Sequence, residues 1–195
     1  MAQKIKSTGK LGLLTVLCLA TWTCSAQRID GVTVTLHSSS ISFPFTRWSA
    51  LRPGVELGVT WNQPNKPQAT GQWNTYVGWF YHENLDQNLY VRGEYQFAYQ
   101  FQNTVRFFAP VGLGYMHSFH AQPTFEQQAD GSIQKATQWG RPHAILNLGL
   151  GAEYLGWNQV APFVKYEAMI QSPFVSTVPV GPRSFLKIGT HINLN

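Results

Sequence analysis

Residues 89–101, LYVRGEYQFAYQF, alternate between apolar and polar side chains along their whole length. One parity is apolar apart from Gly93 and comprises Leu89, Val91, Tyr95, Phe97, Tyr99 and Phe101. The other parity carries Tyr90, Arg92, Glu94, Gln96 and Gln100. A period of two predicts a β-strand with two unlike faces. This strand is longer than the usual five or six residues, and an aromatic face opposite charged residues is typical of a closed barrel in a membrane.

Composition supports strands rather than helices as the membrane-crossing elements. Only 12% of residues are charged, about half the usual share of a soluble domain, while 44% are hydrophobic and the mean hydropathy is −0.17. The longest apolar run, Leu11–Trp22, is shorter than the roughly 20 residues that a spanning helix needs. We therefore do not expect a helical membrane protein.

The first 26 residues read as a cleaved secretory signal peptide. Three lysines precede the apolar run, and Cys24-Ser25-Ala26 follows it as a cleavage site of small residues. The alternative is a lipoprotein signal with Cys24 as the lipidated residue, although Ala20–Thr23 lacks the small, leucine-led approach of such sites. The predicted domains are therefore a signal peptide, residues 1–26, and an outer-membrane barrel, residues 27–195.

Cleavage changes both the cysteine count and the charge of the mature chain. Both cysteines leave with the signal peptide, so disulfides are not expected to hold the mature fold. Three lysines leave as well, so the mature chain has 11 basic and 9 acidic residues. The sequence pI near 9.3 is therefore partly a property of the signal, and nucleic acid is not expected as a partner.

The mature chain divides into eight alternating segments separated by turn-rich connections. They are residues 31–37, 52–61, 72–82, 89–101, 104–116, 143–155, 159–171 and 184–195. We predict an all-β fold, an eight-stranded antiparallel up-and-down transmembrane β-barrel. Pro110 lies inside the fifth segment and cannot donate to a ladder, so we expect a bulge there.

The connections also follow the barrel pattern, in which long outer loops alternate with short periplasmic turns. The expected outer loops are 38–51, 83–88, 120–142 and 172–183, and the turns are 62–71, 102–103 and 156–158. Asp130-Gly131 predicts a hairpin inside the third loop.

Aromatic residues gather at both ends of the segments, as in the interfacial belts of membrane barrels. Trp61, Trp73, Phe101 and Trp157 would lie at the periplasmic rim, and Trp48, Tyr81, Tyr115 and Phe174 at the outer rim. The alternative is a soluble sandwich or lipocalin-like barrel whose core holds the aromatic residues.

The polar parity carries equal numbers of positive and negative charges. The predicted lumen network comprises Glu56, Arg92, Glu94, Arg106, Glu153, Lys165, Glu167 and Lys187. Eight strands enclose an interior just wide enough to be filled by side chains, and ions there are costly unless paired. We therefore predict a closed salt-bridge plug in which Arg106 lies within reach of Arg92 and Glu94. A narrow ion or proton path is the alternative.

Four histidines, His37, His82, His120 and His143, are expected to project inward near the extracellular mouth. They are weak candidates for a transition-metal site, because no short ligand spacing accompanies them. The alternative is that they are interfacial polar residues, and we expect no cofactor.

His117, Ser118 and His120 suggest a Ser/His hydrolase at the outer rim. However, His117 and Ser118 are neighbours in a strand and should face opposite ways. We therefore expect no catalytic residues.

Several short stretches resemble small eight-stranded outer-membrane barrels of the OmpA, OmpX and OmpW type, and most closely uncharacterised barrels from Bacteroidota. They are Ser25-Ala26-Gln27, residues 42–45 (SFPF), 53–58 (PGVELG), 112–118 (GLGYMHS), 149–154 (GLGAEY) and 172–175 (SPFV). The chain departs from many such barrels in ending on Leu194-Asn195 rather than an aromatic residue.

The resemblance implies the outer membrane as location. The implied partners are outer-membrane lipid, lipopolysaccharide and the barrel-assembly machinery. The expected role is non-enzymatic, in envelope integrity or in surface recognition through loops. The alternatives are a lipid A-modifying enzyme, such as a deacylase, and a narrow channel for small hydrophobic solutes. The sequence identifies no extracellular ligand.

Overall fold

The structure is a computed structural model. It describes residues 29–40, 52–61, 69–83, 86–101, 104–122, 125–127, 132–135, 139–157, 159–174 and 179–194. The predicted signal peptide and Trp48 lie outside these residues. In the described part of the chain, no helix is long and apolar enough to cross a membrane.

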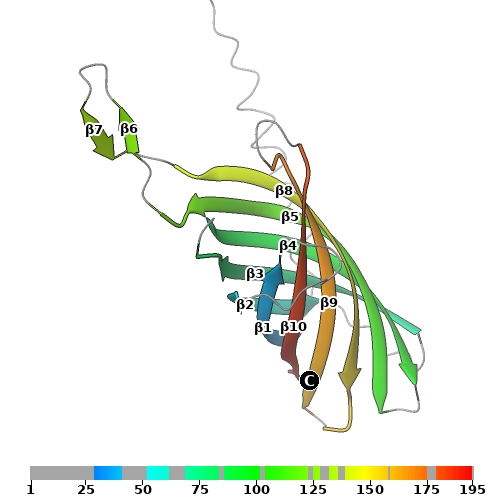
Figure 1. The fold of residues 1–195 in the computed structure, drawn as a ribbon. Helices are drawn as coiled ribbons and strands as arrows, with labels where there is room; N and C mark the ends of the chain where they lie inside the picture. The colour runs from blue at the N-terminus through cyan, green and yellow to red at the C-terminus, as the bar shows by residue number, and fades with distance from the viewer. Residues whose placement is uncertain are drawn as a thin grey trace, which may run out of the picture.

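Eight long strands form the barrel and two short ones form a separate hairpin. The barrel strands are β1 (Ile29–Ser40), β2 (Pro53–Trp61), β3 (Ala69–Tyr81), β4 (Asp86–Phe101), β5 (Val105–His120), β8 (Arg141–Tyr154), β9 (Val160–Ser172) and β10 (Gly181–Asn193). Each pairs antiparallel with its neighbours in sequence order, and β1 pairs with β10 to close the sheet. The predicted eight-stranded antiparallel up-and-down barrel is confirmed (Figure 1).

The barrel turns its apolar face outward. In β4, burial alternates residue by residue, so that Leu89, Val91 and Phe97 are exposed on the outside. The opposite parity points into the barrel and is buried, charged residues included. This pattern is the reverse of a soluble barrel, whose apolar parity faces inward. An exposed belt of large apolar side chains around a closed sheet requires a hydrocarbon environment, and the fold is that of a transmembrane barrel.

The strands begin and end within a few residues of the predicted segments. The largest difference is at β5, which continues to His120 rather than ending at Met116. Its outward parity stays aromatic over this extension, where the Tyr115, His117 and Phe119 rings lie in succession with centroids 6.1 and 4.7 Å apart. β5 therefore extends beyond the end that the sequence predicted.

The expected bulge at Pro110 is wrong. The register between β5 and β8 is unchanged across this position, since Phe108 pairs with Gly151 and Val111 with Leu148. This register places Gly149 opposite the proline, and a Cβ added to Gly149 would lie 3.1 Å from Cγ of Pro110. The glycine leaves room for the proline ring, so the ladder needs no extra residue.

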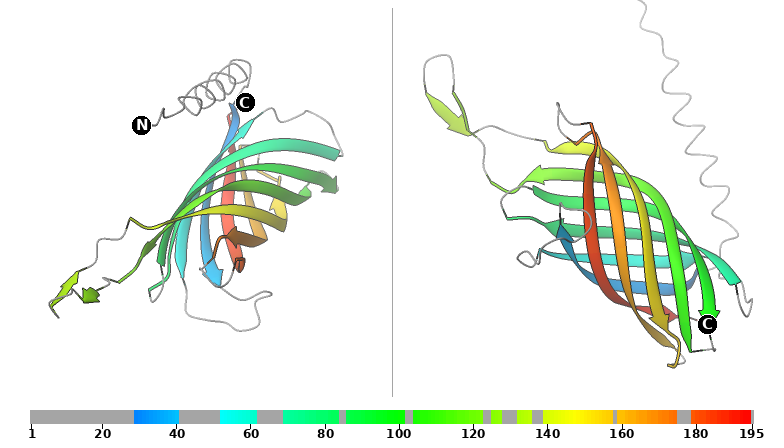
Figure 2. Two further views of the ribbon diagram at one scale, coloured as in Figure 1. Left: turned by 90° about the horizontal axis from the view of Figure 1, so that it is seen from above. Right: turned by 45° about the vertical axis from the view of Figure 1, so that its right-hand side comes forward.

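The two ends of the barrel differ. We call the end with the β4–β5 and β8–β9 connections the turn end, and the opposite end the loop end. The predicted hairpin in the third loop is confirmed as β6 (Phe125–Gln127) paired with β7 (Ile133–Lys135). It projects beyond the ends of β5 and β8 at the loop end (Figures 1 and 2).

Candidate functional site: the filled interior

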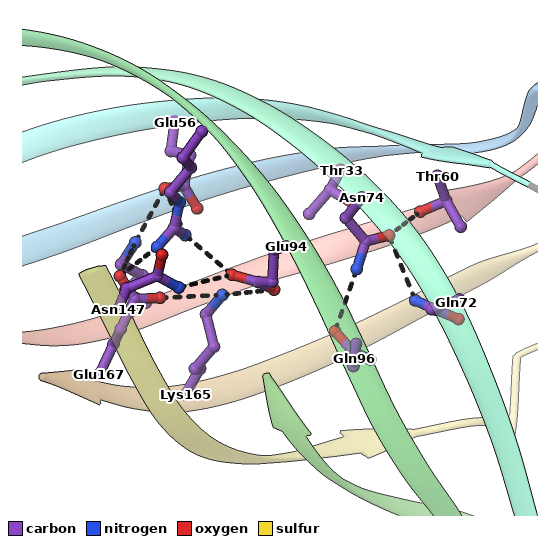
Figure 3. Close-up of polar contacts among 12 residues, drawn as sticks. Thr33, Glu56, Thr60, Gln72, Asn74, Glu94, Gln96, Asn147, Lys165 and Glu167 are labelled. Carbon is purple, nitrogen blue, oxygen red and sulfur yellow. Dashed lines mark hydrogen bonds and ion pairs between the residues drawn. The ribbon is translucent and has the colours of Figure 1, made fainter. Parts of the chain in front are cut away.

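A cluster of six ionised side chains lies across the middle of the barrel. We call it the central cluster, and it comprises Glu56, Arg92, Glu94, Lys165, Glu167 and Lys187, all with relative exposures of 2% or less. Figure 3 shows Glu56, Glu94, Lys165 and Glu167 converging inside the barrel. The six residues come from β2, β4, β9 and β10, so the cluster joins strands from both ends of the chain.

Arg92 is the hub of the central cluster. Its Nη2 lies 2.8 Å from Oε2 of Glu56 and 3.4 Å from Oε2 of Glu94, and its Nη1 is ion-paired with Glu167. Its guanidinium also lies 4.9 Å from the centroid of the Tyr76 ring, at a distance at which a cation–π interaction is favourable. One guanidinium therefore ties together three carboxylates from three strands.

The two lysines complete the pairing. Lys187 Nζ lies 2.8 Å from Oε2 of Glu56 and 3.2 Å from Oε1 of Glu167. Lys165 Nζ lies 3.2 Å from Oε2 of Glu167 and 3.5 Å from Oε1 of Glu94. The lysines face each other directly in the β9–β10 register, which would be repulsive by itself. Each lysine contacts two carboxylates, and the cluster holds three charges of each sign.

Asn147 and Tyr90 add neutral hydrogen bonds to the cluster. The Asn147 amide donates to Oε2 of Glu94 at 3.2 Å, and the Tyr90 hydroxyl donates to Oε2 of Glu56 at 2.6 Å. Buried ions are tolerated when their remaining polar atoms are also bonded. The surrounding side chains therefore supply part of the solvation that water would give.

Arg106 and Glu153 form a separate pair toward the turn end. Nε of Arg106 lies 2.7 Å, and Nη2 2.5 Å, from Oε2 of Glu153 on the neighbouring strand β8. The expectation that Arg106 lies within reach of Arg92 and Glu94 is wrong. Because the β4–β5 connection is short, Arg106 lies opposite Gln100 and Arg92 opposite Gly114, near the other end of the hairpin.

Neutral polar side chains fill the space near this pair. Asn74 Oδ1 accepts from the Thr60 hydroxyl at 2.8 Å and from the Gln72 amide at 3.4 Å. The Asn74 amide donates to Oε1 of Gln96 at 3.3 Å. Figure 3 shows this group displaced along the barrel from the central cluster. None of these residues was assigned a role from the sequence.

An apolar layer lies between the central cluster and the loop end. It consists of Phe80, Tyr90, Met116, Ile145, Met169 and Phe185, each 2% exposed or less. The Phe80 and Phe185 rings meet edge-on with centroids 5.3 Å apart. This layer was not predicted, because the lumen-facing parity was interpreted only through its charges. The signal that could have found it is the large apolar side chain that several strands carry on that parity.

Arg183 covers the apolar layer at the loop end. Its Nη2 donates to Oδ2 of Asp86 at 2.6 Å, its Nε donates to Oε1 of Gln171 at 2.7 Å, and its guanidinium lies 5.2 Å from the centroid of the Phe80 ring. The guanidinium thus links β9 and β10 with β4. Arg183 was expected in a loop, whereas it lies within β10 and is 1% exposed.

The four candidate metal histidines do not converge. His37 packs edge-on against Phe185, with centroids 5.3 Å apart, and Nδ1 of His143 is hydrogen-bonded to the carbonyl of Pro173 at 2.5 Å. His82 is buried at the end of β3, and His120 is exposed at the end of β5. Within the described ranges, no group of three or more His, Cys, Asp or Glu could hold a metal ion.

His117 and Ser118 face opposite sides of the wall, as their adjacency in a strand requires. Outside, His117 Nδ1 lies 2.7 Å from the Tyr115 hydroxyl and Nε2 lies 2.8 Å from the Trp139 carbonyl. Inside, the Ser118 hydroxyl donates to Oδ1 of Asn88 at 2.5 Å. The sheet separates the two side chains, so they do not form a nucleophile–base pair.

Comparisons with known proteins find likeness in fold but not in sequence. No protein-family model matches the chain, and no curated protein sequence matches it. Neisserial surface protein A superposes with a TM-score of 0.55 and 11% identity, covering 87% of this chain and 100% of that one. Ail, the attachment invasion locus protein of Yersinia pestis, superposes with a TM-score of 0.52 and 11% identity, covering 85% of this chain and 97% of that one.

The outer membrane enzyme PagL also matches, with a TM-score of 0.48 and 10% identity over 83% of this chain and 98% of that one. This likeness is too distant to carry an argument about activity. At such identities the matches establish architecture and nothing finer. The chain has the fold of the small eight-stranded outer-membrane β-barrels.

Proposed function

We propose that the protein is a non-enzymatic barrel of the bacterial outer membrane, a closed anchor that presents its outer segments for surface recognition or supports envelope integrity. The filled interior carries this proposal. A conducting pore needs a continuous aqueous path, whereas the central cluster, the apolar layer and Arg183 succeed one another along this barrel.

The hairpin supplies the surface for recognition. Phe125 and Ile133 are 64% and 73% exposed on it, and Trp139, where the chain returns to β8, is 87% exposed. Aromatic side chains are enriched at the centres of binding interfaces. Loops on a rigid scaffold commonly carry function, and the hairpin is the most prominent such projection among the described residues.

The assignment to the outer membrane adds three expectations. The signal peptide, residues 1–26, would direct export, the barrel-assembly machinery would insert the chain, and lipid and lipopolysaccharide would surround the apolar belt. The resemblance to barrels of Bacteroidota belongs with these expectations. Closed barrels resist SDS, so we expect the unboiled protein to migrate differently from the boiled protein on a gel.

Conductance in planar bilayers tests whether the barrel is closed. We expect no single-channel events from the purified protein above those of protein-free bilayers. An ion-path barrel would instead give reproducible steps, and steady conductance would refute the plug. The matched comparison is the double variant Arg92→Ala with Phe185→Ala. It removes the guanidinium at the hub of the central cluster and one ring of the apolar layer.

Analysis of lipid A tests the enzymatic alternative. The lipid A of a strain lacking the gene should have the same mass spectrum as that of the parent strain. Loss or gain of an acyl chain that is restored by the gene would overturn the non-enzymatic role. The Ser118→Ala variant should behave as the parent, because its hydroxyl is bonded to Asn88 inside the wall.

Removing the hairpin separates the two proposed roles. Replacing residues 122–138 with a short Gly-Ser linker should leave the heat-modifiable mobility unchanged, since the hairpin pairs only with itself among the described strands. A strain carrying this variant should lose adhesion to surfaces that bind the parent strain but keep its resistance to detergent. Loss of detergent resistance with adhesion intact would favour the envelope role instead.

A further inference from the structure

Three buried polar atoms without a partner belong to residues that line one small cavity near the turn end. They are Oε1 of Gln72, Oε1 of Glu153 and Nε2 of His191, and they have no hydrogen-bond partner within the protein. Their residues are 3%, 4% and 4% exposed. The cavity has a volume of about 20 Å³, and all three residues line it, together with Thr33 and Lys165.

Each residue is otherwise held in place by a bond through another atom. Glu153 uses Oε2 for Arg106, and the Gln72 amide nitrogen donates to Asn74. Nδ1 of His191 lies 3.1 Å from the Thr33 hydroxyl. If that hydroxyl donates to Nδ1, the imidazole proton is on Nε2, which becomes a donor. The residues at the cavity then offer two acceptors and one donor, on side chains whose other hydrogen bonds fix their orientation.

We propose that this cavity is a binding site for one water molecule. A cavity of about 10–15 Å³ by this measure is large enough for a water, and buried waters make about three hydrogen bonds. The water donates its two protons to Oε1 of Gln72 and Oε1 of Glu153 and accepts from Nε2 of His191. All three atoms gain the partner that buried polar groups almost always have.

The charges at the cavity select water over an ion. The cations Arg106 and Lys165 lie close by, the first bonded to Glu153 and the second in the cavity wall, so a further cation is disfavoured. An anion would face two acceptor oxygens. A neutral molecule that both donates and accepts satisfies all three atoms, and the volume limits it to the size of water.

The proposed water links three hydrogen-bonded groups that the three unpaired atoms do not connect directly. Glu153 belongs to the pair on β5 and β8, Gln72 to the neutral group on β2, β3 and β4, and His191 to the contact between β10 and β1. The water is thus the common point of three hydrogen-bonded groups. It completes the hydrogen bonding on the turn-end side of the central cluster.

A crystal structure of the detergent-folded protein, with crystals soaked in thallium(I) acetate, tests the site directly. We expect one density peak within about 3.2 Å of Oε1 of Gln72 and Oε1 of Glu153, with no anomalous thallium signal there. A cavity without density, or thallium bound in it, would overturn the proposal. This measurement uses the wild-type chain and does not depend on whether the barrel conducts.

A variant provides a second test by NMR. In the wild-type protein we expect a water cross-peak to the His191 ring proton, and Gln72→Leu should abolish it, because the change removes an acceptor that the water needs. Absence of the cross-peak from the wild-type spectrum would overturn the proposal. Thr35→Val, a buried β1 position outside the cavity lining, should leave the cross-peak in place.

Discussion

Replacing Arg92 with alanine is expected to lower the free energy of unfolding by about 3–5 kcal/mol, the range for removing one partner of a buried ion pair. The change leaves Glu56, Glu94 and Glu167 in the barrel with two lysines between them. Their side chains are fully buried, so water cannot replace the lost partner without opening the wall. Denaturant titration of the protein folded in detergent or lipid vesicles measures the effect.

Two further variants separate charge balance from packing. Arg92→Met with Glu167→Met removes one charge of each sign, so it should recover part of the lost stability, because apolar residues of similar volume often replace a buried pair at little cost. Arg141→Ala, at an exposed arginine of β8, should change stability by no more than about 0.5 kcal/mol. Equal losses for Arg92→Ala and Arg141→Ala would contradict the plug.

Replacing Leu113 with arginine is expected to destabilise the barrel in a lipid bilayer by about 2–4 kcal/mol, the cost of an arginine at the midplane of a lipid-facing wall. Leu113 is 67% exposed on the outward face of β5. It lies midway along the wall, paired with Gly93 on one side and Leu146 on the other. Unfolding from vesicles, rather than from detergent, is the appropriate measurement because the bilayer has a defined midplane.

The matched control is Ile133→Arg in the hairpin. Ile133 is as exposed as Leu113, at 73%, but lies on the projecting β7. Arginine there should be tolerated within about 0.5 kcal/mol. If Leu113→Arg were equally harmless while the protein remained folded, the outward face would not be in contact with hydrocarbon, and the membrane orientation of the barrel would be wrong.

The outward and inward faces were predictable because strand periodicity is local. A residue such as Val91 or Arg92 is assigned to a face by parity alone, and closing eight such segments leaves one face for lipid and one for the interior. The connections were predictable for a similar reason, since Asp130-Gly131 indicates a turn without reference to the rest of the chain.

The partners within the interior were not predictable in the same way. Arg106 was expected near Arg92, but register places it beside Glu153. Pro110 was expected to force a bulge, but the opposite residue is Gly149, which leaves room for it. Arg183 appeared to lie in a loop, yet it reaches Asp86 across the barrel mouth. Each outcome depends on residues from distant strands.

By itself, the sequence determined the fold class, the apolar outer belt and eight of the charges that face inward, because these follow from a period of two and from the turns between strands. The tertiary structure alone decided which charge meets which, where the apolar layer lies and which polar atoms border the turn-end cavity. Those features depend on the stagger of strands around a closed barrel. Stagger sets the height of each side chain along the barrel axis, and parity carries no information about height.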